Sequence, residues 1–369
     1  MLFSPSADGP LTAAQITSLI EDLRNQDLNV RINSIKRINT IAQALGSKRT
    51  REELIPYIAE FTDDDDEVQL LIATTLGDMV DAVGGNEYAY VLLVPLETLA
   101  GVEEESVRNA SVAAMQKICA QLSDAHVVEY MLPLLRRLAT QEWFTSKISA
   151  SGLFSTLYPR VTDPLKRELR QQFLQLCNTD ETPMVKRAAT THFGDFCSVM
   201  DSATVGQEFL PVLQKLAKDD QDSVKALTVG ACIAIAKIFG RDNKALNVTK
   251  MTALVKGLVD DKSWRVRYKV ADKFCDLSLA LGPSIAQSDA VLDDFVKLLS
   301  DTEPEVRTAA ASRVGDIAKL AGESQTVKKF LKPLGIGKPS VLQAIVNDSE
   351  EATAFTRGQF KSNHDADWK

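Results

Sequence analysis

Aromatic residues are scarce in this chain, and basic residues do not outnumber acidic ones. Phe, Trp and Tyr make up 6% of the 369 residues, against 45% for all hydrophobic residues. This composition favours helices packed through small and aliphatic side chains over an aromatic-rich β-sandwich. The formal net charge of −8 argues against a nucleic-acid-binding protein, because binding to phosphates requires clustered Lys and Arg in excess. A mostly helical protein with protein partners is therefore expected.

Paired cysteines, a secretory signal and a long apolar run are also missing. The five cysteines are scattered, odd in number and form no CxxC pair, which indicates reduced, intracellular usage. Residues 1–10 contain no basic segment followed by an apolar one and predict a flexible N-terminal tail. The most apolar stretch, Val229 to Ala236, is too short to span a bilayer and ends at Lys237. We expect a soluble cytoplasmic protein, with the nucleus as a second compartment and no membrane partner.

No residues are spaced as an active site or a metal site would require. His126, His192 and His364 are far apart in the sequence and match no pattern of metal ligands or of a base beside a nucleophile. The sequence therefore predicts a protein that is not an enzyme, with no catalytic residue, no metal ion and no cofactor.

A repeat of about 40 residues runs through most of the chain. Its fullest copy, residues 260–274 (DDKSWRVRYKVADKF), predicts a turn that opens a helix, with Ser263 as N-cap. Equivalent anchor residues recur at steps of 38 to 42 residues: Val30, Val68, Val107, Ser146, Val185, Val224, Val266 and Val306. With two helices per period, this pattern predicts an all-α solenoid, a right-handed superhelix of eight antiparallel helix pairs without β-sheet.

The repeats divide the chain into three parts. We expect a tail over residues 1–10, eight repeats over residues 11–322, and a divergent or truncated C-terminal segment over residues 323–369. In this last segment the apolar pattern decays and no further second helix begins.

Charged residues recur at the same period. The residue after each anchor is cationic in seven of eight repeats: Arg31, Gln69, Arg108, Lys147, Lys186, Lys225, Arg267 and Arg307. Six residues before these positions the chain is acidic in five repeats: Asp63, Asp180, Asp219, Asp261 and Asp301. Such spacing predicts a buried ladder of ion pairs that bridges neighbouring repeats and fixes their register, with Asp261 pairing with Arg267. Solvated loop charges are the alternative interpretation.

Prolines and glycines mark the helices. Pro56, Pro95, Pro133 and Pro211 each precede an anchor by 12 or 13 residues, which predicts bent first helices. Five glycines follow an anchor by 16 residues and predict left-handed residues at the ends of second helices: Gly46, Gly84, Gly240, Gly282 and Gly322.

The turns inside the repeats carry side chains that a purely structural turn does not need. Residues 62–67 and 102–105 are acidic, whereas Trp143 and Trp264 place large apolar groups in the turns of repeats four and seven. A Trp beside an Arg, as in Trp264 and Arg265, is typical of binding hot spots. The alternatives are tryptophans that fold back onto the next repeat and acidic runs that are solvated faces.

These turns resemble those of the HEAT-repeat scaffold (A) subunits of protein phosphatase 2A. The similar segments are residues 21–25, 31–36, 143–146, 152–155, 158–161, 182–185 and 261–268. The resemblance covers residues 17–322 and corresponds to the N-terminal eight repeats of that family. It implies a HEAT-repeat α-solenoid that serves as a non-catalytic scaffold or regulatory subunit of the phosphatase.

In that family the early repeats hold regulatory (B-type) subunits along the turns, and the last repeats hold the catalytic subunit. By position, the resemblance implies these partner-binding residues: Asp65, Asp66, Glu67, Glu103, Glu104, Trp143, Pro183, Lys186, Arg187, Ser263, Trp264 and Arg265. Lys186 replaces the family's usual Arg, which argues against a bidentate contact there. A catalytic subunit is expected only if the missing C-terminal repeats are supplied elsewhere. The alternative is a general HEAT-repeat adaptor in transport or complex assembly, which would share only the architecture.

Overall fold

The structure, a computed structural model, describes residues 13–60, 62–178, 182–242, 245–321 and 329. These residues form helices and no strand, which confirms the predicted all-α fold. The chain divides into two compact units, residues 1–185 and 186–369, and α14 begins in the first and continues in the second. The predictions for residues 1–10, for Asp180 and Gly322, and for all of residues 323–369 except residue 329 lie outside the described residues.

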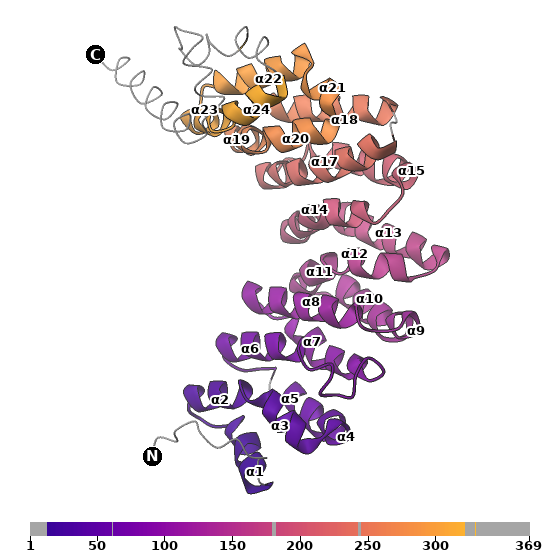
Figure 1. The fold of residues 1–369 in the computed structure, drawn as a ribbon, viewed down its shortest axis with the longest axis vertical. Coiled ribbons are helices and arrows are strands. Elements are labelled where there is room, and N and C mark those ends of the chain that lie inside the picture. The colour runs from indigo at the N-terminus through magenta and orange to yellow at the C-terminus, as the bar shows by residue number, and fades with distance from the viewer. Residues whose placement is uncertain (1–12, 61, 179–181, 243–244, 322–328, 330–369) are drawn as a thin grey trace, which may run out of the picture. The chain divides into compact units, whose positions relative to one another are not determined.

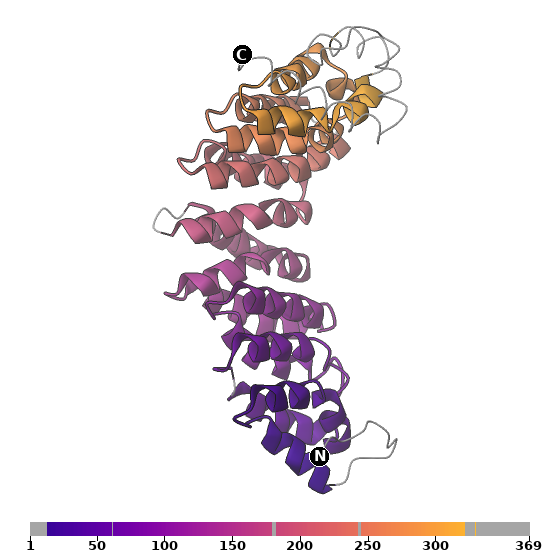
Figure 2. The same ribbon diagram turned by 90° about the vertical axis from the view of Figure 1, so that its left-hand side faces the viewer.

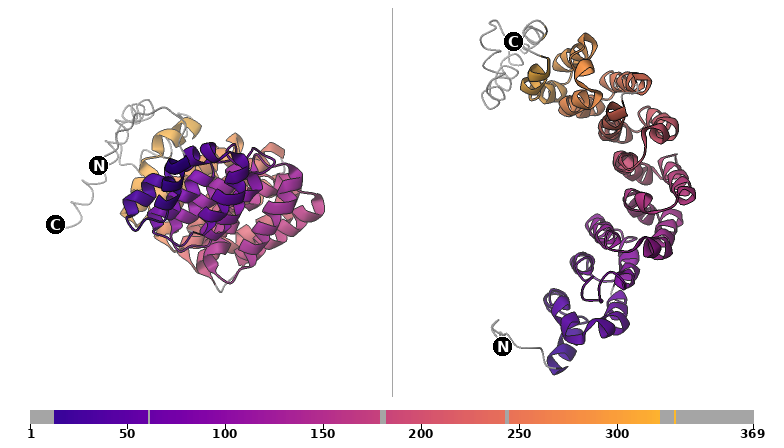
Figure 3. Two further views of the ribbon diagram at one scale, coloured as in Figure 1. Left: turned by 90° about the horizontal axis from the view of Figure 1, so that it is seen from below. Right: turned by 45° about the vertical axis from the view of Figure 1, so that its right-hand side comes forward.

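Unit 1 is built from pairs of helices, each pair consisting of a first and a second helix (Figure 1). The first helices comprise α1 (Ala13–Asp22), α4 (Ser47–Arg49) with α5 (Ile55–Ala59), α7 (Leu93–Leu99), α9 (Asp124–His126) with α10 (Leu132–Thr140), and α13 (Asp163–Asn178). The second helices comprise α2 (Leu28–Ile35) with α3 (Ile38–Leu45), α6 (Asp66–Leu76), α8 (Glu105–Cys119), α11 (Phe144–Ser151) with α12 (Phe154–Leu157), and α14 (Pro183–Ser198). Second helices of successive repeats lie side by side, α2 against α6 and α6 against α8. The right-hand view of Figure 3 shows the indigo-to-magenta helices of this unit nearly end on.

Unit 2 continues the same arrangement. Its first helices comprise α15 (Ser202–Thr204) with α16 (Leu210–Leu216), α18 (Ala245–Val259), and α21 (Pro283–Ala286) with α22 (Asp289–Leu299). Its second helices, after α14, comprise α17 (Asp222–Asp242), α19 (Trp264–Asp272) with α20 (Phe274–Leu281), and α23 (Pro304–Ala311) with α24 (Val314–Ala321). The core lies between the two layers, where Phe209 of the first-helix layer packs edge to face on Phe193 and Phe196 of α14.

The repeat alignment locates the second helices closely. Each of them begins two residues before its anchor, from Leu28 before Val30 to Pro304 before Val306. Apart from Val30, which is partly exposed, every anchor is at most 1% exposed. The anchor is therefore the first core residue of the helix, and the residues just before it start the helix at the surface.

The prolines widen the first helices instead of only bending them. Pro56, Pro133 and Pro211 each follow a π turn, at Thr50–Leu54, Val127–Met131 and Val205–Phe209. In each case the N–H before the proline reaches back five residues, as from Ile55 to Thr50. A proline ring in a regular helix would clash with the carbonyl group four residues earlier, and the wider turn avoids this clash. Pro95 instead follows a 3-10 turn, Ala89–Leu92.

A positive φ angle is confirmed for three of the predicted glycines: Gly46, Gly84 and Gly282, at 78°, 102° and 100°. Gly46 and Gly282 directly follow α3 and α20 as predicted, whereas Gly84 does not end its helix, because α6 already ends at Leu76. The prediction for Gly240 is wrong, because α17 continues through it to Asp242. The apolar stretch around residues 229–236 is thus part of a longer helix than expected. By length and composition, residues 222–240 of α17 could cross a membrane, but α17 packs against α18, α19 and α20 as a core helix of the repeat stack.

Ion pairs link neighbouring repeats, as predicted. The cation of one repeat contacts the carboxylate of the following repeat: Lys186 Nζ to Asp219 Oδ2 at 3.0 Å, Lys225 Nζ to Asp261 Oδ1 at 2.9 Å, Arg267 Nε to Asp301 Oδ2 at 2.6 Å, and Arg31 Nη2 to Asp64 Oδ1 at 2.9 Å. In the second repeat Asp64 therefore takes the place predicted for Asp63. The predicted pairing of Asp261 with Arg267 is wrong, because Arg267 reaches only the backbone oxygen of Asp261, 2.8 Å from its Nη1.

Where the residue after the anchor is an arginine, its guanidinium also donates hydrogen bonds to the turn that precedes its own helix. Arg31, Arg108, Arg267 and Arg307 each donate from Nη1 to the carbonyl oxygens of the residues six and five positions earlier. The guanidinium has five donors in a planar fork, so that Arg267 can hold its turn and Asp301 at once. The Lys225 ammonium group bridges to Asp261 of the next repeat and contacts Asp222 at the start of its own helix, at 2.9 and 3.1 Å.

Neutral contacts replace the ladder in the middle of unit 1. Gln69 Nε2 donates to the backbone oxygen of Thr62 at 2.9 Å, and Ser146 Oγ donates to Gln141 Oε1 at 2.7 Å. Thr145 and Ser149 of α11 donate to the backbone oxygens of Gly101 and Ala100, at 2.6 and 2.7 Å. Repeat four is therefore held to the turn of repeat three by hydroxyl groups instead of an ion pair.

We expect Asp301→Ala to lower the free energy of unfolding by about 2 kcal/mol, because it leaves the largely buried Arg267 charge without its bidentate partner. The side chains of Arg267 and Asp301 are 15% and 7% exposed. Urea unfolding of Asp301→Ala, Arg267→Ala and the double variant measures the coupling. Asp260→Ala is the control, since its ion pair with Lys297 is solvent-exposed and should contribute under about 1 kcal/mol. Additive effects at Arg267 and Asp301 would contradict the pairing.

The same pair predicts a pH dependence. Burial opposes ionisation of Asp301, but hydrogen bonds from Arg267 and from the Glu303 N–H outweigh it and lower the pKa of this carboxyl group in the folded chain. Its stabilising contribution is therefore complete above the unfolded pKa of about 3.9 and disappears as the pH falls through the lower folded pKa. The stability difference between wild type and Asp301→Asn should stay constant from about pH 7 to 5 and shrink below about pH 4. A constant difference down to about pH 2 would contradict this assignment.

Candidate partner-binding surface

The predicted partner-binding residues all lie in the turns or in the first five residues of second helices. We call this set of positions the turn surface: residues 62–67, 100–106, 141–145 and 182–185 in unit 1, and residues 186–187, 217–223, 260–265 and 300–305 in unit 2. In unit 2 the orange-coloured turns follow one edge of the helix stack (Figure 2). Each second helix therefore presents its N-terminal end to this surface.

The acidic turns have a local structural reason. Asp66 and Glu67 occupy the first turn of α6, and Glu105 occupies the first turn of α8, where negative charge is favoured by the helix dipole. Glu104 is the N-cap of α8 and accepts from the backbone N–H and the hydroxyl of Ser106, at 3.3 and 2.9 Å. Asp65 accepts from Arg31 at 2.5 Å. Among the predicted acidic residues, Asp65, Asp66, Glu67 and Glu103 are exposed, and of these Asp65 is paired with Arg31.

Trp143 is the most exposed large hydrophobic residue of the described chain, at 71%. It precedes α11 as the N-cap residue, without a capping bond from its side chain. Thr145 and Ser149 hydrogen-bond α11 to the turn of repeat three. These bonds hold the backbone next to Trp143 in place while its indole ring projects into solvent. Of the two interpretations that the sequence left open for Trp143, packing on the next repeat does not hold.

Met184 is a further exposed apolar residue that was not among the predicted positions. It is 53% exposed and follows Pro183 as the second residue of α14. The residue before the anchor is polar or charged in the other repeats, as in Glu67 and Ser106. This contrast is the signal that could have found Met184. Trp143 and Met184 belong to consecutive repeats of unit 1, so that unit 1 carries two neighbouring apolar turns.

In unit 2, several of the predicted partner-binding residues also make contacts within the repeats. Lys186 has a side chain only 12% exposed and holds Asp219, whereas Arg187 is exposed. Trp264 is half-buried, and the Arg265 guanidinium lies 4.9 Å from the centre of its ring system. This is the geometry of a cation–π contact. Arg187 and Arg265 are thus the planar donors that this part of the turn surface offers to a partner.

Ser263 occupies the N-cap position of α19, but its hydroxyl does not cap the helix as predicted. Instead its N–H donates to Asp261 Oδ1 at 2.8 Å, and its side chain bonds to Asp222. Hydrogen bonds from Ser263 and from Lys225 lower the pKa of the Asp222 carboxyl group. Asp222 therefore stays ionised and links the turns of repeats six and seven.

Both histidines within the described residues contact neighbouring side chains of the fold. The His126 ring packs edge to face on Tyr90 and Tyr130, at 5.7 and 5.5 Å between ring centres. Burial lowers the pKa of His192, while Asp195, 3.7 Å away, partly opposes this effect. His364 lies outside the described residues. Within those residues no three His, Cys, Asp or Glu side chains are grouped as metal ligands would be.

Comparison with known proteins matches the chain to two family models. The model described as "PIK3R4-like, middle domain" matches residues 12–281, and the HEAT repeat model matches residues 291–321. Among solved structures, a Kap95p chain shares 16% identity and superimposes with a TM-score of 0.62, covering 95% of this chain and 47% of that one. The karyopherin Kap121p shares 12% identity with a TM-score of 0.53, over 96% and 46% of the two chains. These likenesses show the solenoid fold alone.

Curated relatives are much more similar in sequence. The regulatory A subunit of protein phosphatase PP2A from Schizosaccharomyces pombe is 41% identical over 74% of this chain and 46% of its own length. The beta isoform of the 65 kDa regulatory A subunit of serine/threonine-protein phosphatase 2A from Homo sapiens is 44% identical over 85% and 51%. The regulatory A subunit of PP2A from Saccharomyces cerevisiae is 36% identical over 76% and 44%. The chain thus spans about half the length of these relatives.

These relatives confirm, at the level of the family, the resemblance to A subunits of protein phosphatase 2A that the turn residues indicated. The chain belongs to the family described as PIK3R4-like, middle domain, and is a HEAT-repeat homologue of the regulatory A subunits of protein phosphatase 2A.

Proposed function

We propose that the chain is a non-catalytic scaffold or regulatory subunit of protein phosphatase 2A that binds a regulatory (B-type) subunit through its turn surface. The single observation that carries the binding site is Trp143, an indole 71% exposed at the start of a helix whose backbone is fixed by Thr145 and Ser149. Trp is enriched among the residues that contribute most to protein–protein affinity. The relatives, which carry the name of regulatory A subunits of this phosphatase, support the choice of complex.

The charges of the turn surface support a partner with charges of both signs. Asp66, Glu67 and Glu103 are exposed in unit 1, and Arg187 and Arg265 are exposed in unit 2. Such charges raise the rate of association and select the partner's orientation more than they raise affinity. In this proposal Trp143 and Met184 supply the affinity, and Pro183 fixes the backbone before Met184.

An intracellular location, in the cytoplasm and the nucleus, is part of the proposal. All five cysteines are thiols outside any disulfide, and four of them are buried. Burial raises the pKa of the Cys119 thiol to about 11, with Arg160 partly opposing it, and also raises the pKa values of Cys177 and Cys232. Such thiols remain protonated and unreactive at neutral pH, as suits a chain that relies on no disulfide.

We expect Trp143→Ala to weaken the binding of purified B-type regulatory subunits by tenfold or more, because truncation removes a large apolar contact from the proposed surface. Its thermal stability should stay within about 0.5 kcal/mol of wild type, since the indole is exposed in the free chain. Met184→Ala should weaken binding by a smaller factor. Calorimetric titration together with thermal melts measures both quantities.

Leu279→Ala is the matched control, because Leu279 is 51% exposed in α20 and lies away from the turn surface. It should leave binding unchanged. An equal loss of affinity in Trp143→Ala and Leu279→Ala, or unchanged affinity in Trp143→Ala, would show that Trp143 is not part of the interface.

A further inference from the structure

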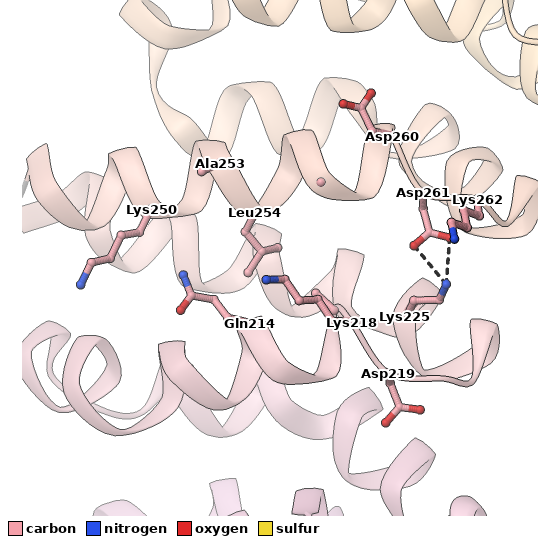
Figure 4. Close-up of a pocket in the computed structure, with 12 residues that line it drawn as sticks. Gln214, Lys218, Asp219, Lys225, Lys250, Ala253, Leu254, Asp260, Asp261 and Lys262 are labelled. Atoms are coloured by element: carbon pink, nitrogen blue, oxygen red, sulfur yellow. Dashed lines mark hydrogen bonds and ion pairs between the residues drawn. The ribbon is translucent and has the colours of Figure 1, made fainter.

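A groove lies between the first helices of two consecutive repeats in unit 2. It has a volume of about 590 Å³ and is lined by α16 and its turn on one side and by α18 and its turn on the other. Figure 4 shows Lys250 and Gln214 at one end, Lys218 in the middle, and Lys262 at the other end. The predicted partner-binding residues do not line this groove.

Small residues keep the groove open. Ala217, Ala253, Leu254 and Gly257 form its apolar lining. Ala253 and Gly257 are four residues apart on one face of α18, and a Cβ atom added to Gly257 would meet no atom within 4 Å. The helix therefore presents a shallow face to which the backbone of a ligand can come close.

The carboxylates in the groove are already bound to cations. Asp219 pairs with Lys186, Asp260 with Lys297, and Asp261 with Lys225. In Figure 4 the side chains of Asp219 and Asp260 point away from the groove, toward the neighbouring helices.

Three lysines of the groove have no such partner. Within the described part of the chain, Lys218, Lys250 and Lys262 form no ion pair. The groove is therefore locally cationic on a chain whose net charge is −8. Low-dielectric walls around like charges concentrate the field and attract anionic groups.

The spacing of these lysines indicates the size of the ligand. Lys250 is nine positions from Val259, the last residue of α18 before the turn that carries Lys262. At about 1.5 Å per residue this distance is about 14 Å. An extended peptide covers it with about four or five residues at about 3.3 Å each. A single phosphate or sulfate ion could reach only one end.

We propose that the α16–α18 groove binds an acidic peptide segment of a partner protein. In the complex, carboxylates about four residues apart contact Lys250 at one end and Lys218 or Lys262 toward the other. Small apolar residues between them lie on Ala253 and Gly257. Backbone carbonyl groups of the peptide accept from the Gln214 amide. The groove shares turn residues 217–219 and 260–262 with the turn surface but contains none of the predicted partner-binding residues, and the proposal does not depend on the function proposed for them.

The test uses the full chain and a fluorescein-labelled peptide, EDALED, in fluorescence anisotropy. The uncharged analogue QNALQN should bind at least tenfold more weakly, and affinity for EDALED should fall as salt is raised. The double variant Lys218→Glu/Lys250→Glu should lose at least tenfold in affinity. Its matched control is Lys237→Glu/Lys319→Glu, which changes the net charge equally at two exposed lysines outside the groove and should stay within twofold of wild type.

Gly257→Leu tests the shape of the groove without changing its charge. The new side chain enters open space, and Leu is the better helix former, so that thermal melts should show no loss of stability. EDALED should nevertheless bind at least tenfold more weakly. Equal binding of QNALQN, an equal loss in the control double variant, or unchanged binding by Gly257→Leu would overturn the proposal. Displacement of the peptide by sodium sulfate at matched ionic strength would overturn it too, because the ligand would then be a simple anion.

Discussion

The contact on which the rest of the structure depends is the bridge from a cation near the start of one second helix to a carboxylate of the following repeat. In Arg267 a single guanidinium holds two carbonyl groups of its own turn and both oxygens of Asp301. Because these groups are largely buried, a shift of one repeat against the next would leave charges without partners. The bridge therefore fixes the register in which the apolar faces meet, and with it the positions of the turns.

This constraint sorts the charges of the turn surface into two groups. Lys186 and Asp65 are engaged in bridges, and Glu104 caps its helix, so that a partner could use them only by breaking internal contacts. Arg187 and Arg265 are exposed beside them. The chain can thus vary its exposed charges to suit a partner without changing the contacts that hold its repeats together.

The groove and the turn surface overlap in the turns of repeats six and seven. Second helices supply the turn surface with their N-terminal ends, whereas the groove is lined by the sides of α16 and α18, by residues 217–219 and 260–262 of the turns, and by Lys225 of α17. Asp219 and Asp261 lie between the two, since both line the groove and both belong to the ladder.

The sequence by itself determined the repeat, the helical class and the positions of the second helices, each of which begins two residues before its anchor. These features are local, because a helix start and an apolar period depend on neighbouring residues. It also located Trp143 and Trp264 in turns, but not that the first is exposed and the second half-buried. Only the tertiary structure decided that Asp261 pairs with Lys225, 36 residues away, instead of with Arg267. The reason is geometric: a ladder of fixed period allows pairing within a repeat or between repeats, and only the stacking of packed helices selects one of them.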